Sequence, residues 1–470
     1  MSSPVHRRDF LKGAASSVAA PSLAAGLQSS QSGPRPPNIL YLHSHDTGRY
    51  IQPFGHGIST PNLQTLAAEG VLFRRCFSAA PTCSPSRAAL LTGQAPHTCG
   101  EFGLVNFGFS LAHPERHIAR VLKPAGYYTA AAGIQHILKN TLDAGYDEVV
   151  HSGPALENGW AAVLEPEVVK FLSRPPKQPF FMAAGFVERH RPYHPHGPAD
   201  DPRYTIPPAP IPDTPDTRLD MANFKNTARV LDTAIGNILG ALERKGLAGN
   251  TLVIYSTDHG VAFPDMKCSL QDAGMGVSLI VRGPGGFSGD KVIDALVSHL
   301  DIYPTLCDVA KAGRPSWLQG HSMLPLVNGE TNKIRGEVFA EVTYHIAYEP
   351  KRCIRTGRYK YIRHFLDRDR PVIANCDDSP SKQYWLKEGW QQQHADREEF
   401  FDLVFDPHEM RNLIADPSVH SIAEDLRSRL DRWMKDTGDP ILNGPIQAPS
   451  GARVWGPDAS FPGPGFVTIP

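Results

Sequence analysis

The stretch NTLVIYSTDHG at residues 250–260 is the clearest indication of how this chain folds. Its apolar run is short and uninterrupted, which is typical of a strand buried on both faces of a parallel sheet. The run ends at the polar pair Asp258 and His259. Because binding sites in such sheets lie beyond the carboxyl ends of the strands, this pair is a candidate for function. The alternative is that both side chains belong to a turn or cap a following helix.

The stretch PNILYLHSHD at residues 37–46 has the same plan and ends at His45 and Asp46. Three further apolar runs predict strands: GYYTAAAG at 126–133, QPFFMAAGF at 178–186 and SLIVRGPG at 278–285. Apolar residues recur every three or four positions from Phe224 to Leu242, which predicts one long amphipathic helix. Strands that alternate with helices predict an α/β fold, with a mostly parallel sheet flanked by helices. Both polar pairs would then meet at one edge of the sheet.

The pattern of apolar and polar residues changes after about residue 330. The stretch RTGRYKYIRHF at residues 355–365 alternates in the manner of an exposed antiparallel strand, and a periodic helical stretch follows it. We therefore predict three regions: residues 1–32 as a signal and linker, 33–330 as a catalytic domain, and 331–470 as a smaller subdomain with an antiparallel sheet and a Pro/Gly-rich tail.

The segments at the start of the chain follow one another in the order typical of an export signal. The stretch HRRDFLK at residues 6–12 is a twin-arginine pattern, and a mildly apolar, Ala-rich run follows it. That run is too short and too weak to span a membrane. We predict cleavage near Ala24 and Ala25, with the twin-arginine translocase as a partner, no membrane span in the mature chain, and a periplasmic or secreted protein. The alternative is a disordered basic tail.

Composition excludes some classes of partner. The chain has 470 residues, a formal net charge of −1 and a pI near 7.1, so nothing indicates binding to nucleic acid. Its seven cysteines have no CxxC spacing, which argues against a zinc knuckle. An oxidising destination would permit a disulfide, but the sequence does not select a pair.

One cysteine lies in a motif of its own. The stretch PTCSPSRAALLTG at residues 81–93 contains Cys83, a proline two positions later, Arg87 and a Thr-Gly pair. With four fixed positions at roughly 5% each, a chance match in a chain of this length is on the order of one in several hundred. A buried free thiol would need none of these neighbours. A nucleophile held at the start of a helix would use all of them.

This stretch resembles the C-x-P-S-R signature of the sulfatase family. The stretches NILYLHSHD, GYYTAAAGIQH, TLVIYSTDHG and VSHLDIYPTLCDVAK resemble further blocks of that family, so that the resemblance covers about residues 37–439. FPDMKCSLQDAG, AYEPKRCIRTGRYKYI and DPHEMRNLIADP resemble the branch of heparan N-sulfatases (sulfamidases). The resemblance implies an alkaline-phosphatase-like sandwich with a large, mostly parallel sheet and a smaller C-terminal antiparallel sheet.

The resemblance also implies a modification and a mechanism. Cys83 would be oxidised to Cα-formylglycine (3-oxoalanine) by a formylglycine-generating enzyme or an anaerobic sulfatase-maturating enzyme. The hydrated aldehyde would attack sulfur and then collapse to release sulfate, which is covalent catalysis with a built-in release step. Arg87 and the start of the helix would hold the anionic nucleophile.

A divalent metal is implied at the edge of the sheet. Asp46, Asp258, His259 and the modified Cys83 match the family's metal-binding positions, and His45 stands where most relatives have a second Asp. We expect one ion, with calcium as the first choice because oxygen ligands favour it. Magnesium, or manganese with the two imidazoles, is the alternative.

Sulfate needs cationic donors, and the resemblance assigns three. Lys267 matches the lysine that follows the metal strand, and His136 and His190 match two histidines that could protonate the leaving group. His97 matches a near-site histidine. Ile134 is a departure, because it stands where the family has a lysine that touches both nucleophile and sulfate.

The stretch AEVTYHIAYEPKR at residues 340–352 suits a sugar, because it combines Glu341, Tyr344, His345 and Arg352. These residues either bind substrate or tie the subdomain to the core. We expect a hydrolase that acts on sulfated saccharides of the glycosaminoglycan type, with N-sulfoglucosamine as the first candidate and an O-sulfated hexosamine as the second. The alternatives are a phosphate or phosphonate ester hydrolase of the same superfamily and a secreted glycan-binding pseudoenzyme.

Overall fold

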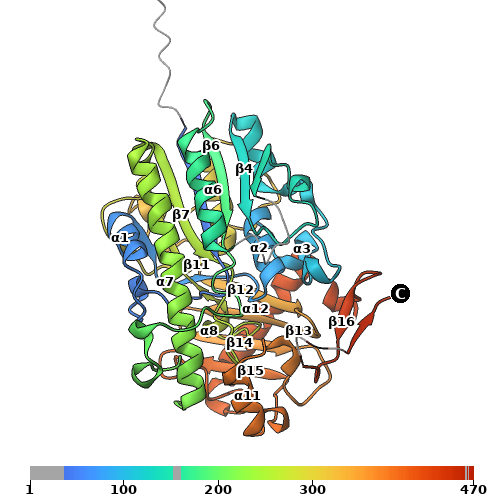
Figure 1. Cartoon of the computed structure of the whole chain (residues 1–470). Helices are drawn as coiled ribbons and strands as arrows, with labels where there is room; N and C mark the ends of the chain where they lie inside the picture. Colours follow the sequence, from blue (N-terminus) through green and yellow to red (C-terminus); the bar gives the residue numbers. More distant parts are fainter. Residues whose placement is uncertain (1–35, 152–159, 461–462, 464) are drawn as a thin grey trace, which may run out of the picture. The chain divides into compact units, whose positions relative to one another are not determined.

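An eight-stranded sheet is the centre of the structure (Figure 1). This computed structural model describes residues 36–151, 160–460, 463 and 465–470. The predicted twin-arginine signal and linker at residues 1–32 lie outside the described residues. The strands lie in the order β10 (Lys291–Ile293), β2 (Val71–Phe73), β9 (Leu279–Arg282), β7 (Thr251–Thr257), β1 (Asn38–Ser44), β6 (Phe180–Gly185), β4 (Tyr128–Gly133) and β5 (Glu148–His151).

The sheet is mostly parallel, as predicted. The inner strands β7, β1, β6 and β4 all run parallel to their neighbours within that group, and only β9 runs antiparallel to both strands beside it. β1 and β7 are buried along almost their whole length, which explains their continuous apolar sequences. Ser44 pairs with Thr257, so both strands end at the same level and their polar pairs emerge side by side.

Helices cover both faces of this sheet. α1 (Pro61–Glu69), α6 (Ala161–Ser173) and α7 (Pro215–Arg244) pack on one face, where they share an apolar core with β1, β6 and β7. α2 (Cys83–Thr92), α4 (Ile118–Leu122), α9 (Ile302–Val309) and α10 (Leu324–Val327) pack on the other face. The helix α7 confirms the predicted long amphipathic helix, and Figure 1 shows it running along β7.

A four-stranded antiparallel sheet follows in the C-terminal region. It contains β12 (Glu337–Tyr344), β13 (Tyr348–Thr356), β14 (Tyr359–His364) and β15 (Glu398–Asp402), in that order. The helix α12 (His420–Thr437) packs on one face through the cluster that includes Ile354, Tyr361 and Phe400. The opposite face packs on Phe77, Leu270 and Met275 of the preceding region.

The prediction of an exposed strand at residues 355–365 was therefore wrong about burial. Lys360, Tyr361 and Ile362 of β14 are each at most 2% exposed. The alternation is real, but it separates two buried faces, because successive side chains point to opposite sides of the sheet. Lys360 is tolerated inside because its ammonium group pairs with Asp272 and Glu409.

Smaller elements complete the described residues. β11 (Val297–Ser298), β3 (Cys76–Phe77) and β8 (Gly276–Val277) form a three-stranded sheet, and α3 (Pro96–Cys99), α8 (Asp272–Met275) and α11 (Pro380–Lys387) are short helices. A C-terminal hairpin joins β16 (Arg453–Trp455) to β17 (Phe466–Thr468). None of the described helices has both the length and the hydropathy to cross a bilayer. All seven cysteines are buried free thiols.

The predicted boundary between residues 330 and 331 falls between α10 and β12, where the chain passes from the large sheet to the four-stranded sheet. Residues 36–470 cluster as one compact unit. The division into a catalytic domain and a C-terminal subdomain remains a prediction.

Candidate active site

Cys83 is the first residue of α2, and the whole helix is buried. Thr82 precedes it in an extended conformation, and Pro85 lies in the first turn, where a missing N–H group costs nothing. The helix ends at Gly93, whose φ of 69° suits glycine at this position. The motif thus builds a short, rigid helix whose N-terminus carries partial positive charge beside Cys83.

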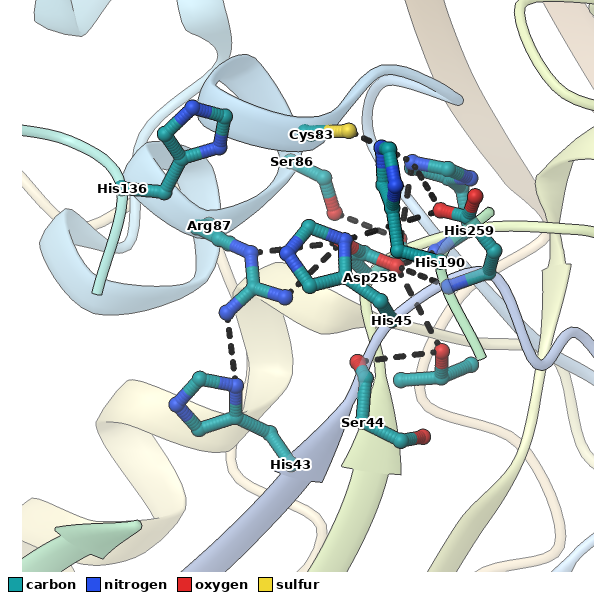
Figure 2. Close-up of polar contacts among 12 residues, drawn as sticks. His43, Ser44, His45, Cys83, Ser86, Arg87, His136, His190, Asp258 and His259 are labelled. Carbon is teal, nitrogen blue, oxygen red and sulfur yellow. Dashed lines mark hydrogen bonds and ion pairs between the residues drawn. The ribbon is translucent and has the colours of Figure 1, made fainter. Parts of the chain in front are cut away.

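The two polar pairs at the strand ends meet near Cys83, and Figure 2 shows His45, Asp258 and His259 among them. The backbone N–H of Asp46 donates to Oδ1 of Asp258 at 2.9 Å. Nε2 of His259 lies 3.4 Å from Oδ1 of Asp46 and 3.4 Å from Sγ of Cys83. Nδ1 of His45 lies 3.0 Å from Oδ2 of Asp258. The shared register of β1 and β7 therefore brings together His45, Asp46, Asp258 and His259, and α2 places Cys83 beside them.

This cluster has the geometry and the unpaired atoms of a cation site. One ligand atom each from His45, Asp46, Cys83 and Asp258 lie within 4.8 Å of one another. Nε2 of His45 and Oδ1 of Asp46 are buried without a hydrogen-bond partner. Buried polar atoms of this kind are costly unless a ligand satisfies them. A divalent metal ion fits the donor set.

The electrostatics of the cluster also favours a bound cation. Burial and Arg87 lower the pKa of His45, but Asp258 outweighs them and raises it to about 10. Burial likewise lowers the pKa of His259, but Asp258, Cys83 and Asp46 raise it to about 9. The two carboxylates thus attract positive charge strongly enough to keep protons on both imidazoles well above neutral pH.

Arg87 orients the metal-ligand candidates. Its Nε and Nη2 atoms donate to Oδ2 of Asp258 at 3.2 and 2.9 Å, and its Nη1 lies 2.7 Å from Nδ1 of His43. The hydrogen bonds of Arg87 therefore go to Asp258 and His43. The contact between Arg87 and the nucleophile, which the resemblance implies, stays a prediction. His43 is only 5% exposed and was not predicted. It faces inward from β1 two residues before His45.

Lys267 bridges two buried carboxylates. Its Nζ donates to Oδ2 of Asp46 at 3.0 Å and to Oδ2 of Asp377 at 2.7 Å. Burial lowers the pKa of Lys267, but Asp377 and Asp46 raise it well above its usual value, so the group is a permanent cation. Sequence reasoning missed Asp377, which lies in an irregular stretch of the C-terminal region with no strand or motif to indicate it.

Three predicted histidines surround the cluster. The ring of His45 lies 6.1 Å from that of His136 and 5.3 Å from that of His190, measured between centroids. Nε2 of His136 lies 3.1 Å from Oδ1 of Asn106. His345 is buried in the loop between β12 and β13.

The thiol of Cys83 is in a strongly cationic setting. Burial raises the pKa of Cys83, but Lys267, His259 and His136 together lower it well below its usual value. Burial lowers the pKa of both His136 and His190. Ile134 is buried and apolar, so it supplies no charge at the position of the family lysine.

Glu341 and Arg352 are engaged elsewhere. Arg352 is fully buried, and its Nε and Nη2 atoms bind both carboxylate oxygens of Asp439 at 2.6 and 3.0 Å. Glu341 accepts from the backbone N–H of His97 at 2.6 Å and lies 3.2 Å from Nε of Arg352. His97, Glu341 and Asp439 have the spacing of a metal site, but Arg352 already supplies the positive charge. This geometry favours the alternative in which both residues tie the C-terminal region to the core.

Two family profiles match the sequence of this chain. The sequence profile of the sulfatase family matches residues 37–312. A second profile, described as N-sulphoglucosamine sulphohydrolase, C-terminal, matches residues 262–383.

Individual proteins agree with these matches. The human N-sulphoglucosamine sulphohydrolase is 29% identical over 468 residues, which cover 87% of this chain and 92% of that protein. An ulvan-active sulfatase of Formosa agariphila is 28% identical and covers 86% of this chain and 76% of its own length. A solved structure in complex with its substrate D-glucosamine-2-N,6-O-disulfate has a TM-score of 0.67 at 19% identity, with 87% of this chain and 99% of that chain covered. The last comparison shows a shared fold.

Proposed function

This chain belongs to the sulfatase family, and we propose that it is a hydrolase that releases sulfate from sulfated saccharides. The observation that carries the proposal is the position of Cys83. Its sulfur lies at the N-terminus of a buried helix, 3.4 Å from His259, and belongs to the cluster with Asp46 and Asp258 at the strand ends. A structural thiol needs neither the carboxylates nor the cations that surround it.

We propose that Cys83 is converted to formylglycine by a maturation enzyme, and that Sγ marks the place of the oxygens of the hydrated aldehyde. One hydroxyl oxygen of the hydrate attacks sulfur, and the bond from sulfur to the alcohol or amine breaks. The other hydroxyl then loses its proton, the C=O bond re-forms, and the bond between carbon and sulfate oxygen breaks. Sulfate leaves, and the aldehyde is ready for water to hydrate it again.

The surrounding residues bind the sulfate group, position the nucleophile and transfer protons. Lys267 offers a fixed cation for the sulfate oxygens, while Arg87 holds Asp258 in place. His190 is the candidate donor to the leaving group when its ring is protonated, because Nδ1–H donates to the carbonyl of Arg191 at 2.7 Å and the imidazolium then has a second N–H, on Nε2, for the substrate. His136 is the candidate that accepts the proton of the second hydroxyl.

Asp46, Asp258, His45, His259 and the modified Cys83 would hold a divalent cation, which lowers the pKa of the attacking hydroxyl and balances developing charge. Calcium is our first candidate because the carboxylates and the hydrate supply oxygen ligands. The imidazoles of His45 and His259 make manganese the main alternative, with magnesium next.

The substrate class follows from the relatives. We propose N-sulfoglucosamine as the first candidate, supported by the C-terminal profile over residues 262–383 and by the human relative. An O-sulfated hexosamine or another sulfated glycan is second, because ulvan-active relatives are almost equally similar. The twin-arginine pattern supports export to the periplasm or medium, where such polymers are found.

Two measurements test the proposal. A peptide mass map of residues 81–93, from protein made together with a formylglycine-generating enzyme, is expected to show an aldehyde in place of the Cys83 thiol. A panel of sulfated sugars, with matched phosphate esters, is expected to show sulfate release and little phosphate release. Active enzyme in which Cys83 is fully alkylated as a thiol would refute the mechanism. Faster hydrolysis of the phosphate esters would favour the phosphoester alternative, and binding without any turnover would favour a pseudoenzyme.

A further inference from the structure

The C-terminal hairpin packs close to the segment that carries Cys83. The backbone N–H of Trp455 donates to the carbonyl of Ile346 at 2.9 Å, which attaches β16 to the loop that follows β12. Trp455 also belongs to the same apolar cluster as Cys83, Leu104 and Phe107. The last strands of the chain therefore reach the surroundings of the nucleophile, although they lie some 370 residues away in sequence.

Arg453 is held rigidly on this hairpin. Its guanidinium carbon lies 5.1 Å from the ring centroid of Phe107 and 5.6 Å from that of Phe466. Its Nη2 atom donates to the carbonyl of Asn106 at 2.9 Å. The side chain is exposed, and it forms no ion pair with any carboxylate of the described residues. Arg453 is thus an exposed cation whose direction is set by two rings and one carbonyl.

The same segment connects Arg453 to the catalytic groups. Oδ1 of Asn106 lies 3.1 Å from Nε2 of His136, and the backbone N–H of Val105 donates to Oγ of Ser84, next to Cys83, at 3.1 Å. Exposure falls along this path: Arg453 and Asn106 are exposed, His136 is half-buried and Cys83 is 1% exposed. A saccharide that places its sulfate at Cys83 would leave its next sugar at the exposed end, beside Arg453.

We propose that Arg453 determines specificity by binding a second anionic group, a uronate carboxylate or another sulfate, on the sugar next to the one that loses its sulfate. A guanidinium matches these planar or forked oxygen pairs with two parallel hydrogen bonds. The flanking rings and Asn106 fix its direction, so little conformational entropy is lost when the anion binds. The inference rests on the proposed function and names a feature of its substrate.

The test compares two substrates and several variants. The substrates are a disaccharide of N-sulfoglucosamine linked to a uronic acid, and the same disaccharide with the carboxylate reduced to an alcohol. We expect the wild type to favour the acid about tenfold to a hundredfold in kcat/KM, as for a hydrogen-bonded charge pair. Arg453→Gln keeps a donor for Asn106 but is expected to bring the ratio close to one. Arg453→Lys should keep part of the ratio, and Arg432→Gln, which removes an exposed charge on α12, should keep all of it.

A binding measurement separates this inference from the proposed function. In a Cys83→Ala background, calorimetry is expected to show tighter binding of the acid than of the reduced disaccharide with Arg453 present, and equal binding with Arg453→Gln. The difference should shrink as salt is raised. Equal binding of both disaccharides by the Arg453 enzyme, or no binding of either, would overturn the inference. Binding that depends on Arg453 without turnover by the Cys83 enzyme would support the inference and count against the proposed reaction alone.

Discussion

At the scale of single residues, the site is organised by shared counter-ions. Lys267 donates to Asp46 on one side and to Asp377 on the other, so one ammonium group joins the strand-end cluster to the C-terminal region. Arg87 pairs with Asp258, and its Nη1 also lies beside Nδ1 of His43. Asp46 and Asp258 are thus each positioned by a buried partner of opposite charge, which keeps the geometry fixed before substrate arrives.

The Lys267 bridge leads to a first prediction. Asp377→Asn removes one of the two charges that hold Nζ, so the ammonium group should shift toward Asp46. We expect kcat to fall roughly tenfold to a hundredfold, because small displacements of a positioning group have effects of this size. Steady-state kinetics on the best sulfated sugar checks this. Asp378→Asn changes the exposed neighbouring carboxylate and should keep kcat; equal losses in both variants would mean that Asp377 has no special role.

The strand-end cluster leads to a second prediction. Chelation should abolish turnover, and calcium or manganese should restore it. Asp258→Asn should lose activity while the domain stays folded, because the amide keeps the shape but not the charge. Added metal should raise the melting temperature of the wild type by mass action but not that of the variant. Full activity in excess chelator would remove the metal from the mechanism, and far better recovery with manganese than with calcium would favour a phosphoester substrate.

The sequence was sufficient to locate the residues that follow recognisable strands or lie in recognisable motifs. Asp46 and Asp258 follow two recognisable buried strands, so their meeting could be expected from parallel pairing. The place of Cys83 beside them was implied by the resemblance of its motif. Asp377 and His43 could not be found in this way. Asp377 reaches the site only through the packing of the C-terminal region, and His43 lies inside a strand where a histidine reads as one more buried residue.

At the scale of elements, the short helix α4 depends on a titratable cap. Nδ1 of His117 accepts a hydrogen bond from the backbone N–H of Ala119 at 3.1 Å and so caps the helix. Burial and Arg120 lower the pKa of His117 to about 3. The cap works only with the neutral ring, because a protonated Nδ1 has no lone pair to offer.

This cap gives a third prediction. The unfolded chain takes up a proton at His117 below about pH 6.5, whereas the folded chain resists it until about pH 3. Stability from this residue is therefore complete above pH 6.5 and is lost as the pH falls, by at most about 1.4 kcal/mol per pH unit. His117→Asn keeps an N-cap without titrating. Denaturant unfolding from pH 7 to 4 should show a smaller decline for the variant than for the wild type, and parallel declines would contradict the prediction.

The elements also show where sequence patterns stop being informative. The prediction of α7 succeeded because one polar face meets solvent and one apolar face meets the sheet. The prediction for β14 failed on burial because both faces of the strand are covered, and Lys360 is fully buried beside Asp272 and Glu409. Ion pairs between distant segments make a buried face look polar, and the sequence contains no local sign of them.

At the scale of the whole molecule, a buried network joins the C-terminal sheet to the core. His97 on α3, Glu341 on β12, Arg352 on β13 and Asp439 after α12 are all in contact. Nε2 of His97 also lies 2.8 Å from Oγ1 of Thr437 at the end of α12. The sequence left two roles open for Glu341 and Arg352: binding a sugar, or tying the subdomain to the core. Their burial and mutual pairing favour the second role, a junction between the C-terminal region and α3.

Arg352→Met is therefore expected to act on stability. It removes the only guanidinium that balances Glu341 and Asp439 within the described network, and breaking a buried pair from one side costs about 3–5 kcal/mol. The melting temperature should fall, while the ratio of activities on a sulfated saccharide and on a small aryl sulfate should stay as in the wild type. The double change Arg352→Met with Asp439→Asn should recover part of the loss, because one uncompensated charge is removed with it. A selective loss on the saccharide, with an unchanged melting temperature, would return Arg352 to the substrate-binding site.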